Sequence, residues 1–175
     1  MAFSFEQLTL DLRTAAAQEA PEPAVRNVLT AALTRADKML EATSLGGEAE
    51  VQLFEDETVS IWICRFDPDV VMPPHEHRMR VLIAGYAGAE HSLLYERSAG
   101  GLTQVGSATA RAGEVIALDE GAIHAVTALD GVPSYAVHVY FGPLMAIKRD
   151  LFDWESGQAV DFTMENFDAM KRPAN

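Results

Sequence analysis

The segment Pro73-Pro74-His75-Glu76-His77 constrains the fold of this chain more than any other. Residues i and i+2 of a β-strand point to the same face, so His75 and His77 can set two imidazoles side by side, about 6–7 Å apart along the backbone. Glu76, between them, points to the opposite face. Two imidazoles on one face suit two adjacent positions around one metal ion. We therefore predict that His75 and His77 are metal ligands at the mouth of a strand.

A third histidine is expected to complete this site from a distant part of the chain. His124 ends the segment Gly113-Glu-Val-Ile-Ala-Leu-Asp-Glu-Gly-Ala-Ile-His124. The residues between His77 and His124 contain several short strand-like segments, enough to cross a small barrel and return. The sequence therefore predicts that strand pairing brings His124 to His75 and His77.

The middle of the chain, from about 48 to 142, has the spacing of apolar segments and turns that is typical of an all-β domain. Short apolar segments alternate with turn residues such as Asp67-Pro68-Asp69, Gly88, Gly113 and Asp130-Gly131. Eight short strands at this spacing are typical of a β-sandwich or barrel. The expected strands are 49–55, 59–66, 79–85, 90–97, 102–110, 114–118, 123–129 and 134–141.

We expect one domain over 1–175, in which the two ends of the chain differ from this middle part. Residues 1–46 are expected to form two helices. The first is capped by Ser4, with Gln7 completing a capping box, and the second has Pro23 in its first turn. The apolar stripe of the second helix predicts packing against a sheet. It consists of Val25, Val28, Leu29, Ala32, Leu33, Ala36, Met39 and Leu40. A C-terminal extension over 143–175 contains a possible short helix at 163–170.

Charge and composition exclude several classes of protein. The net charge of −13 argues against binding to nucleic acid or to anionic membranes. No apolar run approaches the roughly 18–20 residues of a membrane-spanning helix, and the N-terminus has no signal-peptide layout, so we expect a cytoplasmic protein. The single cysteine, Cys64, excludes an intramolecular disulfide and reads as a small buried hydrophobe.

The order of these motifs resembles that of the cupin superfamily, whose fold is a double-stranded β-helix, a small jelly-roll barrel. Its first motif, G-x5-H-x-H-x3–4-E-x6-G, is matched by His75 and His77 and can close at Gly88; the positions of the glutamate hold Val81 and Leu82. Its second motif, G-x5-P-x-G-x2-H, is matched by Gly113, Gly121 and His124, with Asp119 in place of proline. The resemblance implies a mainly β fold with an N-terminal helical segment.

Without that glutamate the chain looks like the cysteine dioxygenase-like branch, whose iron site has three histidines and no carboxylate. That branch has a Ser-x-His-x-Tyr strand beside the metal, and here the strand reads Ala136-Val-His138-Val-Tyr140. The stretch from His138 to Asp161 resembles bacterial predicted metal-dependent members of the branch. The resemblance implies that His138 and Tyr140 act beside the metal as catalytic groups; the alternative is a satisfied pair in the core.

Two departures from the branch bear on the substrate. Leu82 stands where a cysteine crosslinked to the tyrosine occurs in animal cysteine dioxygenase, so this crosslink cannot form. The family arginine that binds the cysteine carboxylate should fall near residues 48–52, but no Lys or Arg occurs between Met39 and Cys64. Cysteine is therefore expected to be a poor substrate. Another arginine could hold an anionic substrate, with Arg80 as first choice because it follows His77 by three residues. The alternatives are Arg65, Arg78 and Arg97.

A neutral face of three histidines favours an anionic ligand such as a thiolate on the metal. We expect one divalent ion, Fe(II) in the first hypothesis, with zinc, nickel and copper left open, and a dioxygenase that adds O2 to a small thiol other than cysteine. The alternatives are another three-histidine cupin enzyme, such as a β-diketone-cleaving dioxygenase, and a non-catalytic binding module. His91 is expected to be a surface or satisfied histidine. Solvated charges are expected at Glu90, Glu96 and Glu120.

Overall fold

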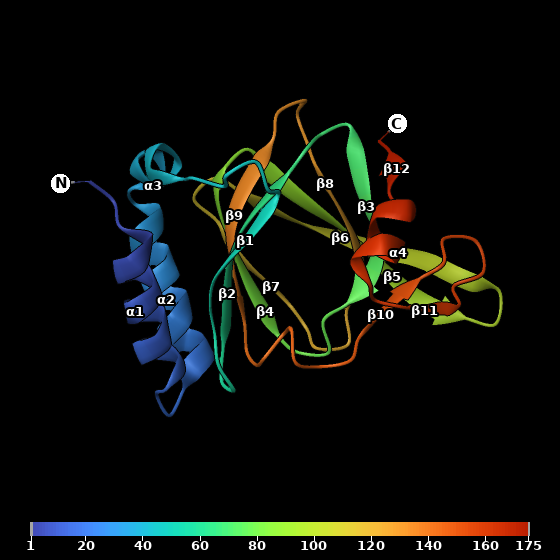
Figure 1. Ribbon diagram of the computed structural model, residues 1–175, viewed down its shortest axis with the longest axis horizontal. Coiled ribbons are helices and arrows are strands. Elements are labelled where there is room, and N and C mark those ends of the chain that lie inside the picture. The colour runs from blue at the N-terminus through green and yellow to red at the C-terminus, as the bar shows by residue number, and fades with distance from the viewer. Residues whose placement is uncertain (1, 175) are drawn as a thin grey trace.

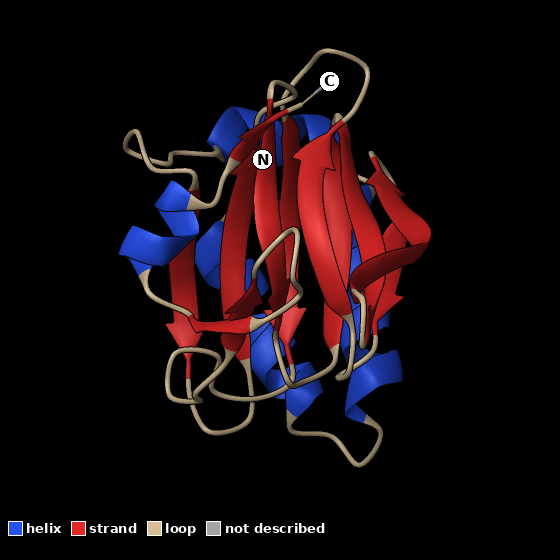
Figure 2. Cartoon of the chain, turned by 90° about the vertical axis from the view of Figure 1, so that its right-hand side faces the viewer, coloured by secondary structure: helices blue, strands red, loops and turns tan. Residues whose placement is uncertain are grey.

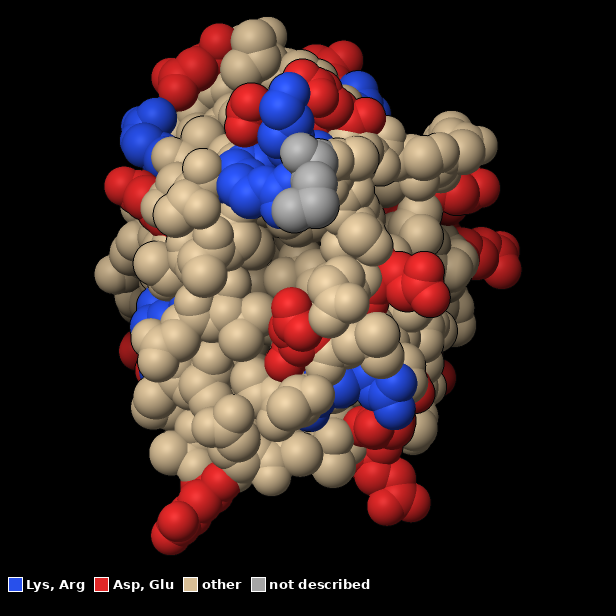
Figure 3. Space-filling model, turned by 90° about the vertical axis from the view of Figure 1, so that its left-hand side faces the viewer, with Lys and Arg blue, Asp and Glu red and all other residues tan. Residues whose placement is uncertain are grey.

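A computed structural model describes residues 2–174, and its elements form a layer of helices against two β-sheets (Figure 1). The helical layer comes from the N-terminal part of the chain, as the apolar stripes predict. Its outward face carries interspersed acidic and basic side chains (Figure 3). The helices are α1 (Phe5–Ala16), α2 (Pro21–Leu33) and α3 (Ala36–Ala42).

The capping residue in the sequence predicts the start of the first helix correctly, but the apolar spacing does not reveal a turn that divides the second predicted helix. The Ser4 side chain accepts a hydrogen bond from the backbone N–H of Gln7 at 3.1 Å, which confirms the N-cap. The Gln7 side chain donates to Asp11 instead of reaching back, so the capping box is only half formed. The second predicted helix is in fact two, because the chain turns at Thr34 and Arg35. The apolar spacing continues through this turn and therefore does not reveal it.

The β part consists of two antiparallel sheets with a continuous strand order. The first sheet has the order β1-β2-β9-β4-β7, and the second has the order β11-β10-β3-β8-β5-β6, with β12 paired to β3. Figure 2 shows the strands lying side by side, with helices and loops around them. The strands of the first sheet are β1 (Glu50–Glu55), β2 (Ser60–Phe66), β4 (Val81–Ala87), β7 (Val115–Leu118) and β9 (Ser134–Tyr140). Those of the second are β3 (Val70–Glu76), β5 (Ala89–Ser98), β6 (Gly101–Arg111), β8 (Ile123–Ala128), β10 (Asp150–Phe152), β11 (Ala159–Asp161) and β12 (Arg172–Pro173).

The eight strands from β2 to β9 have the connectivity of a jelly roll. One sheet contains β2-β9-β4-β7 and the other contains β3-β8-β5-β6, so that the chain passes from sheet to sheet at every step except β5 to β6. This order is that of a double-stranded β-helix. It confirms the expected fold class, mainly β with an N-terminal helical segment.

Between residues 48 and 142, the strand that carries His75, β3, is absent from the eight strands expected from the sequence; the short strands β10, β11 and β12 of the C-terminal extension are absent from them as well. β3 contains Pro73 and Pro74, and prolines within a run argue against a strand because they cannot donate to the ladder. The structure accommodates them at an irregularity: β3 pairs with β8 at Met72 and again at His75, with a register shift between these two positions. The prolines therefore lie where the regular ladder is interrupted.

The C-terminal extension adds short elements to the open edge of the second sheet. β10 pairs with β3 opposite His75 and continues through β11, and the chain then enters helix α4 (Met164–Ala169). The Thr163 side chain caps α4 by accepting a hydrogen bond from the Asn166 N–H at 3.1 Å. The short helix expected at 163–170 is confirmed. The extension thus lies beside the strand that carries the first histidine (Figure 1).

The central strands of the first sheet, β2, β4 and β9, are buried on both faces. The outer face of the sheet packs against the helices in one apolar cluster, in which Leu12, Leu29 and Met39 meet Leu82 and Val139. Its inner face packs against the second sheet. In the described part of the chain, no helix is long and apolar enough to span a membrane.

Replacing Leu12 by alanine tests the helical layer. Leu12 is 0% exposed in this cluster, so removing its methyl groups should leave a cavity and lower the free energy of unfolding by about 2–5 kcal/mol. The control is Leu10→Ala on the same helix, where the leucine is 47% exposed and the change should stay within about 0.5 kcal/mol. Urea unfolding followed by circular dichroism measures both, and equal effects would contradict the packing described here.

Candidate metal centre

Three histidines converge on the inner wall between the sheets, as the sequence predicts. His75, in β3, pairs directly with His124 in β8, and His77 follows one residue after the end of β3. The Nε2 atom of His77 lies 3.1 Å from that of His75 and 3.4 Å from that of His124. One ring nitrogen from each residue lies within 4.8 Å of the others, which is close enough for all three to bind one ion.

Hydrogen bonds at the opposite ring nitrogens orient two of these imidazoles. The Nδ1 atom of His75 lies 2.9 Å from the carbonyl oxygen of Pro73. Since a carbonyl only accepts, Nδ1 carries the proton and the lone pair of Nε2 is left for a metal. The Nδ1 atom of His124 lies 3.0 Å from the hydroxyl of Ser92, which leaves its Nε2 facing the cluster.

Burial keeps the three imidazoles neutral. It lowers the pKa of His75 from its ordinary value to about 4. Burial, reinforced by the neighbouring histidines, holds the pKa values of His77 and His124 well below the usual range. Neutral imidazole is the form that binds metal ions, so the donor set fits a divalent cation at neutral pH.

Among the described residues, the cluster contains no carboxylate. Glu76 points away, as expected, and forms an ion pair with Arg78 at the surface. Of Val81 and Leu82, the two residues at the possible positions of the family glutamate, Leu82 is expected to take its place, but this needs a correction, because Leu82 packs under the helices. Val81 pairs with Tyr140 and shares its inner cluster, so the inward-facing position is Val81. Both residues are apolar, and the conclusion that no carboxylate stands there is unchanged.

The histidines open into a pocket of about 640 Å³, which lies within the range of small-molecule sites. Both sheets and the C-terminal extension supply its walls. The first sheet contributes Trp62, Cys64, His138 and Tyr140. Cys64 is 2% exposed, as expected for a buried small residue, and burial raises the pKa of its thiol well above the usual value.

A buried chain of hydrogen bonds runs beside the histidine cluster. The Nδ1 atom of His138 lies 3.0 Å from the hydroxyl of Tyr140, and its Nε2 atom lies 2.8 Å from a carboxylate oxygen of Glu90. The ring of Tyr140 meets that of His77 edge to face, with 4.9 Å between centroids. The structure therefore brings the two residues proposed to act beside the metal to the pocket wall.

The structure corrects the prediction for Glu90. The sequence predicts a solvated charge there, but Glu90 is 1% exposed and bonded to His138. A signal for this is present in the period-two pattern of β5, where Glu90 and Ser92 share the inward face and each bonds a histidine. His91, between them, is half-buried and satisfied by the Thr109 hydroxyl at 2.8 Å, as expected.

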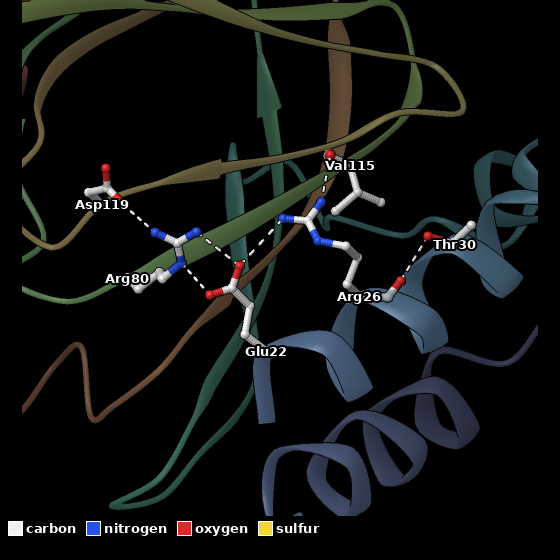
Figure 4. Close-up of polar contacts among 6 residues, drawn as sticks. All are labelled: Glu22, Arg26, Thr30, Arg80, Val115 and Asp119. Atoms are coloured by element: carbon white, nitrogen blue, oxygen red, sulfur yellow. Dashed lines mark hydrogen bonds and ion pairs between the residues drawn. The ribbon is translucent and has the colours of Figure 1, made fainter. Parts of the chain in front are cut away.

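Arg80 lies away from the pocket. Its guanidinium donates to Glu22 of α2 at 2.9 Å and to Asp119, which ties the helical layer to the barrel rim (Figure 4). Arg80 is not among the residues that line the pocket, whereas Arg149 is. Sequence reasoning missed Arg149 because it lies in the C-terminal extension, far along the chain from all three histidines.

Comparisons with known proteins concern the fold. No protein-family model matches the chain. A conserved protein with a double-stranded β-helix domain from Klebsiella pneumoniae is similar over 70% of this chain and 89% of its own, at 13% identity and a TM-score of 0.48. An RmlC-like cupin family protein from Methanocaldococcus jannaschii matches over 59% and 89%, at 12% identity and a TM-score of 0.47.

A third similar structure is the vicilin from Solanum melongena, which matches over 68% of this chain and 36% of its own, at 13% identity and a TM-score of 0.47. These identities and TM-scores are too low to transfer any residue's role. The strand order and the converging histidines support the conclusion by themselves: the chain folds as a cupin-type double-stranded β-helix with a candidate metal centre of three histidines.

Proposed function

We propose that the protein is a metal-dependent enzyme of the thiol dioxygenase type, acting on a small thiol other than cysteine. One observation carries the proposal: three neutral imidazoles converge, without a carboxylate among the described residues, on the wall of a pocket sized for a small molecule. Such a donor set leaves a divalent ion with its full charge and favours an anionic ligand.

His75, His77 and His124 would hold one Fe(II) ion in this site. The ion would supply the redox chemistry by which both atoms of O2 are added to a thiolate sulfur, giving a sulfinate. The chain itself binds and orients the substrate. Trp62 and Cys64 cover the inner wall with largely apolar surface, which limits access of water to the reacting sulfur.

Tyr140 is the polar group positioned to assist the reaction. Glu90 fixes the ring of His138, and His138 in turn orients the hydroxyl of Tyr140 on the pocket wall next to His77. A hydrogen-bonding or proton-transferring group at such a place typically contributes about 100-fold or more to a rate.

Tyr140→Phe should therefore lower the turnover number about 100-fold while metal content and fold stay unchanged, because only one oxygen atom is removed. Oxygen uptake, with metal content measured on the same sample, checks this. Tyr95→Phe is the matched control, since Tyr95 is not among the residues that line the pocket. A wild-type rate in Tyr140→Phe would make Tyr140 a packing residue, and loss of metal would make it structural.

The function is tested on protein purified without a histidine tag. Metal analysis comes first, followed by oxygen uptake with a series of small thiols and β-diketones and by mass spectrometry of the products. A sulfinate carrying two oxygen atoms from labelled O2 is the expected result. Cleavage of a diketone would show that the enzyme is a β-diketone-cleaving dioxygenase instead of a thiol dioxygenase. Bound metal without any oxygen uptake would indicate a non-catalytic binding module.

Cysteine serves as the comparison substrate in this series. The pocket wall near residue 50 carries Glu50 rather than a cation, so it offers no positive partner to a cysteine carboxylate placed there. Turnover of cysteine at about 1 s⁻¹ or more would contradict the restriction to other thiols.

A further inference from the structure

The part of the pocket that lies between the two sheets is apolar apart from the histidines and Tyr140. Strands β2, β3, β8 and β9 supply it, and among the described residues none that these strands contribute to the lining is an acid, a lysine or an arginine. Their apolar lining residues are Trp62, Cys64, Phe66, Met72 and Val126. A polar ligand group placed here would lose its hydration without regaining hydrogen bonds, so this space favours an apolar ligand body.

Two phenylalanines of the C-terminal extension continue this apolar lining beside His75. Phe162 follows β11 directly, and Phe167 lies in α4, which Thr163 caps. The two rings stack with 5.4 Å between centroids and an angle of 25° between their planes. They meet the ring of His75 edge to face, at 6.0 Å for Phe162 and 6.1 Å for Phe167. An aromatic wall therefore adjoins one of the three predicted metal ligands.

Two cationic side chains hold these rings in place. The central carbon of the Arg149 guanidinium lies 3.6 Å from the ring centroid of Phe162, and the Lys171 nitrogen lies 5.3 Å from that of Phe167. A cation over an aromatic ring is attracted by the negative face of the ring, which stabilises both positions. Rings that are fixed before a ligand arrives lose little conformational freedom when the ligand packs against them. The aromatic wall is therefore preorganised for binding.

The charged side chains of the pocket do not select a charged ligand body. In the described part of the chain, the charged lining residues are Glu48, Glu50, Lys148, Arg149, Asp161, Asp168 and Lys171. Four are acidic and three are basic. Lys148 pairs with Asp161 at 3.1 Å, and Lys171 pairs with Asp168 at 2.7 Å. Because the two signs largely offset each other, the pocket gains little from a charge on the ligand body.

The pocket also has room for a ring. Its volume of about 640 Å³ falls in the range of pockets that enclose drug-sized ligands. A cavity of about 150 Å³ is sufficient for benzene, so a phenyl or fused-ring group fits here together with a short chain that links it to sulfur. A two-carbon thiol would leave most of the apolar lining in contact with water.

We propose that this pocket binds an arylalkyl thiol: the aromatic ring packs against Phe162 and Phe167, and a short chain carries the sulfur to the three histidines. The thiol end rests on the function proposed above, whereas the aromatic end rests on the pocket lining. Phe162 and Phe167 are then the residues that determine specificity. Ring–ring contacts with them are worth about 2- to 10-fold in affinity beyond the burial of apolar area.

Calorimetry without oxygen on Fe(II)-loaded protein tests the proposal with three thiols: ethanethiol, 2-cyclohexylethanethiol and 2-phenylethanethiol. Burial of the phenyl group should make 2-phenylethanethiol bind about 10- to 100-fold more tightly than ethanethiol. Phe162→Leu keeps an apolar side chain but removes the ring. It should therefore weaken binding of the phenyl ligand about 2- to 10-fold more than binding of the cyclohexyl ligand, without changing metal content.

Phe54→Leu is the matched control, because Phe54 is also a half-buried ring under an arginine, Arg13 at 3.9 Å, but does not line the pocket. This variant should keep the wild-type affinities for all three thiols. Phe167→Leu repeats the measurement at the other ring, and circular dichroism checks the fold of each variant. Equal affinity of the wild type for 2-phenylethanethiol and ethanethiol would overturn the apolar site. Equal losses for the phenyl and cyclohexyl ligands in both pocket variants would overturn the aromatic one.

Ligands without sulfur separate this proposal from the dioxygenase. On metal-free protein, 2-phenylethanol should bind more tightly than ethanol, and Phe162→Leu should reduce that difference; ligand-observed NMR measures both. This result in a protein that takes up no iron would refute the dioxygenase and the thiol group while retaining the aromatic site. Oxygen uptake with ethanethiol and 2-phenylethanethiol at the same kcat/KM would refute the aromatic site and leave the thiol dioxygenase proposal standing.

Discussion

Alanine in place of His124 is expected to weaken metal binding by more than about 100-fold, beyond the loss typical when a group that only orients a ligand is removed. His124 supplies the nitrogen from the opposite strand, and without it only His75 and His77 remain, both from one segment of the chain. The cluster has no carboxylate among the described residues to take its place. Metal content after dialysis, and competition with a chromophoric chelator, measure the effect.

His91→Ala is the control for this substitution. His91 is half-buried and hydrogen-bonded to Thr109, outside the cluster, so its removal should leave metal affinity at the wild-type level. Circular dichroism of both variants separates loss of metal from loss of fold. Full metal occupancy in His124→Ala would show that the third ligand has been misassigned.

Gly88→Ala is expected to lower the free energy of unfolding by at least about 3 kcal/mol, the largest effect that we expect of a single added methyl group. Gly88 joins β4 to β5 with φ +64°, a conformation that costs an L-residue about 1–2 kcal/mol. A β-carbon there would also lie 2.4 Å from the carbonyl oxygen of Pro133. Backbone atoms cannot rotate away as a flexible side chain can, so the two turns must move apart.

Gly131→Ala separates these two contributions. Gly131 has nearly the same dihedral angle, φ +69°, but no atom lies within 4 Å of an added β-carbon. Only the conformational cost should remain, about 1–2 kcal/mol. Urea unfolding of both variants gives the difference that belongs to the steric contact with Pro133. If the two variants were equally stable, the close approach of these turns would not be as the structure shows it.

Local spacing determined much of this protein. Two histidines separated by one residue on a strand must share a face, and Ser4 before a helical stripe must cap it, whatever the rest of the chain does. The spacing of strands and turns was sufficient to predict a mainly β sandwich or barrel, whereas the double-stranded β-helix was implied by the resemblance to the cupin motifs. These features depend on residues within a few positions of one another, and their geometry follows from backbone dihedrals.

Tertiary structure decided what surrounds the histidines. Glu90 is buried because it pairs with His138 on another strand, and Arg149 reaches the pocket because the C-terminal extension pairs with β3. The face that Leu82 presents depends on which side of its sheet the helices cover. Periodicity tells which side chains share a face, as it does for Glu90 and Ser92, but it does not identify the partner of a buried charge, because long-range strand pairing brings that partner in.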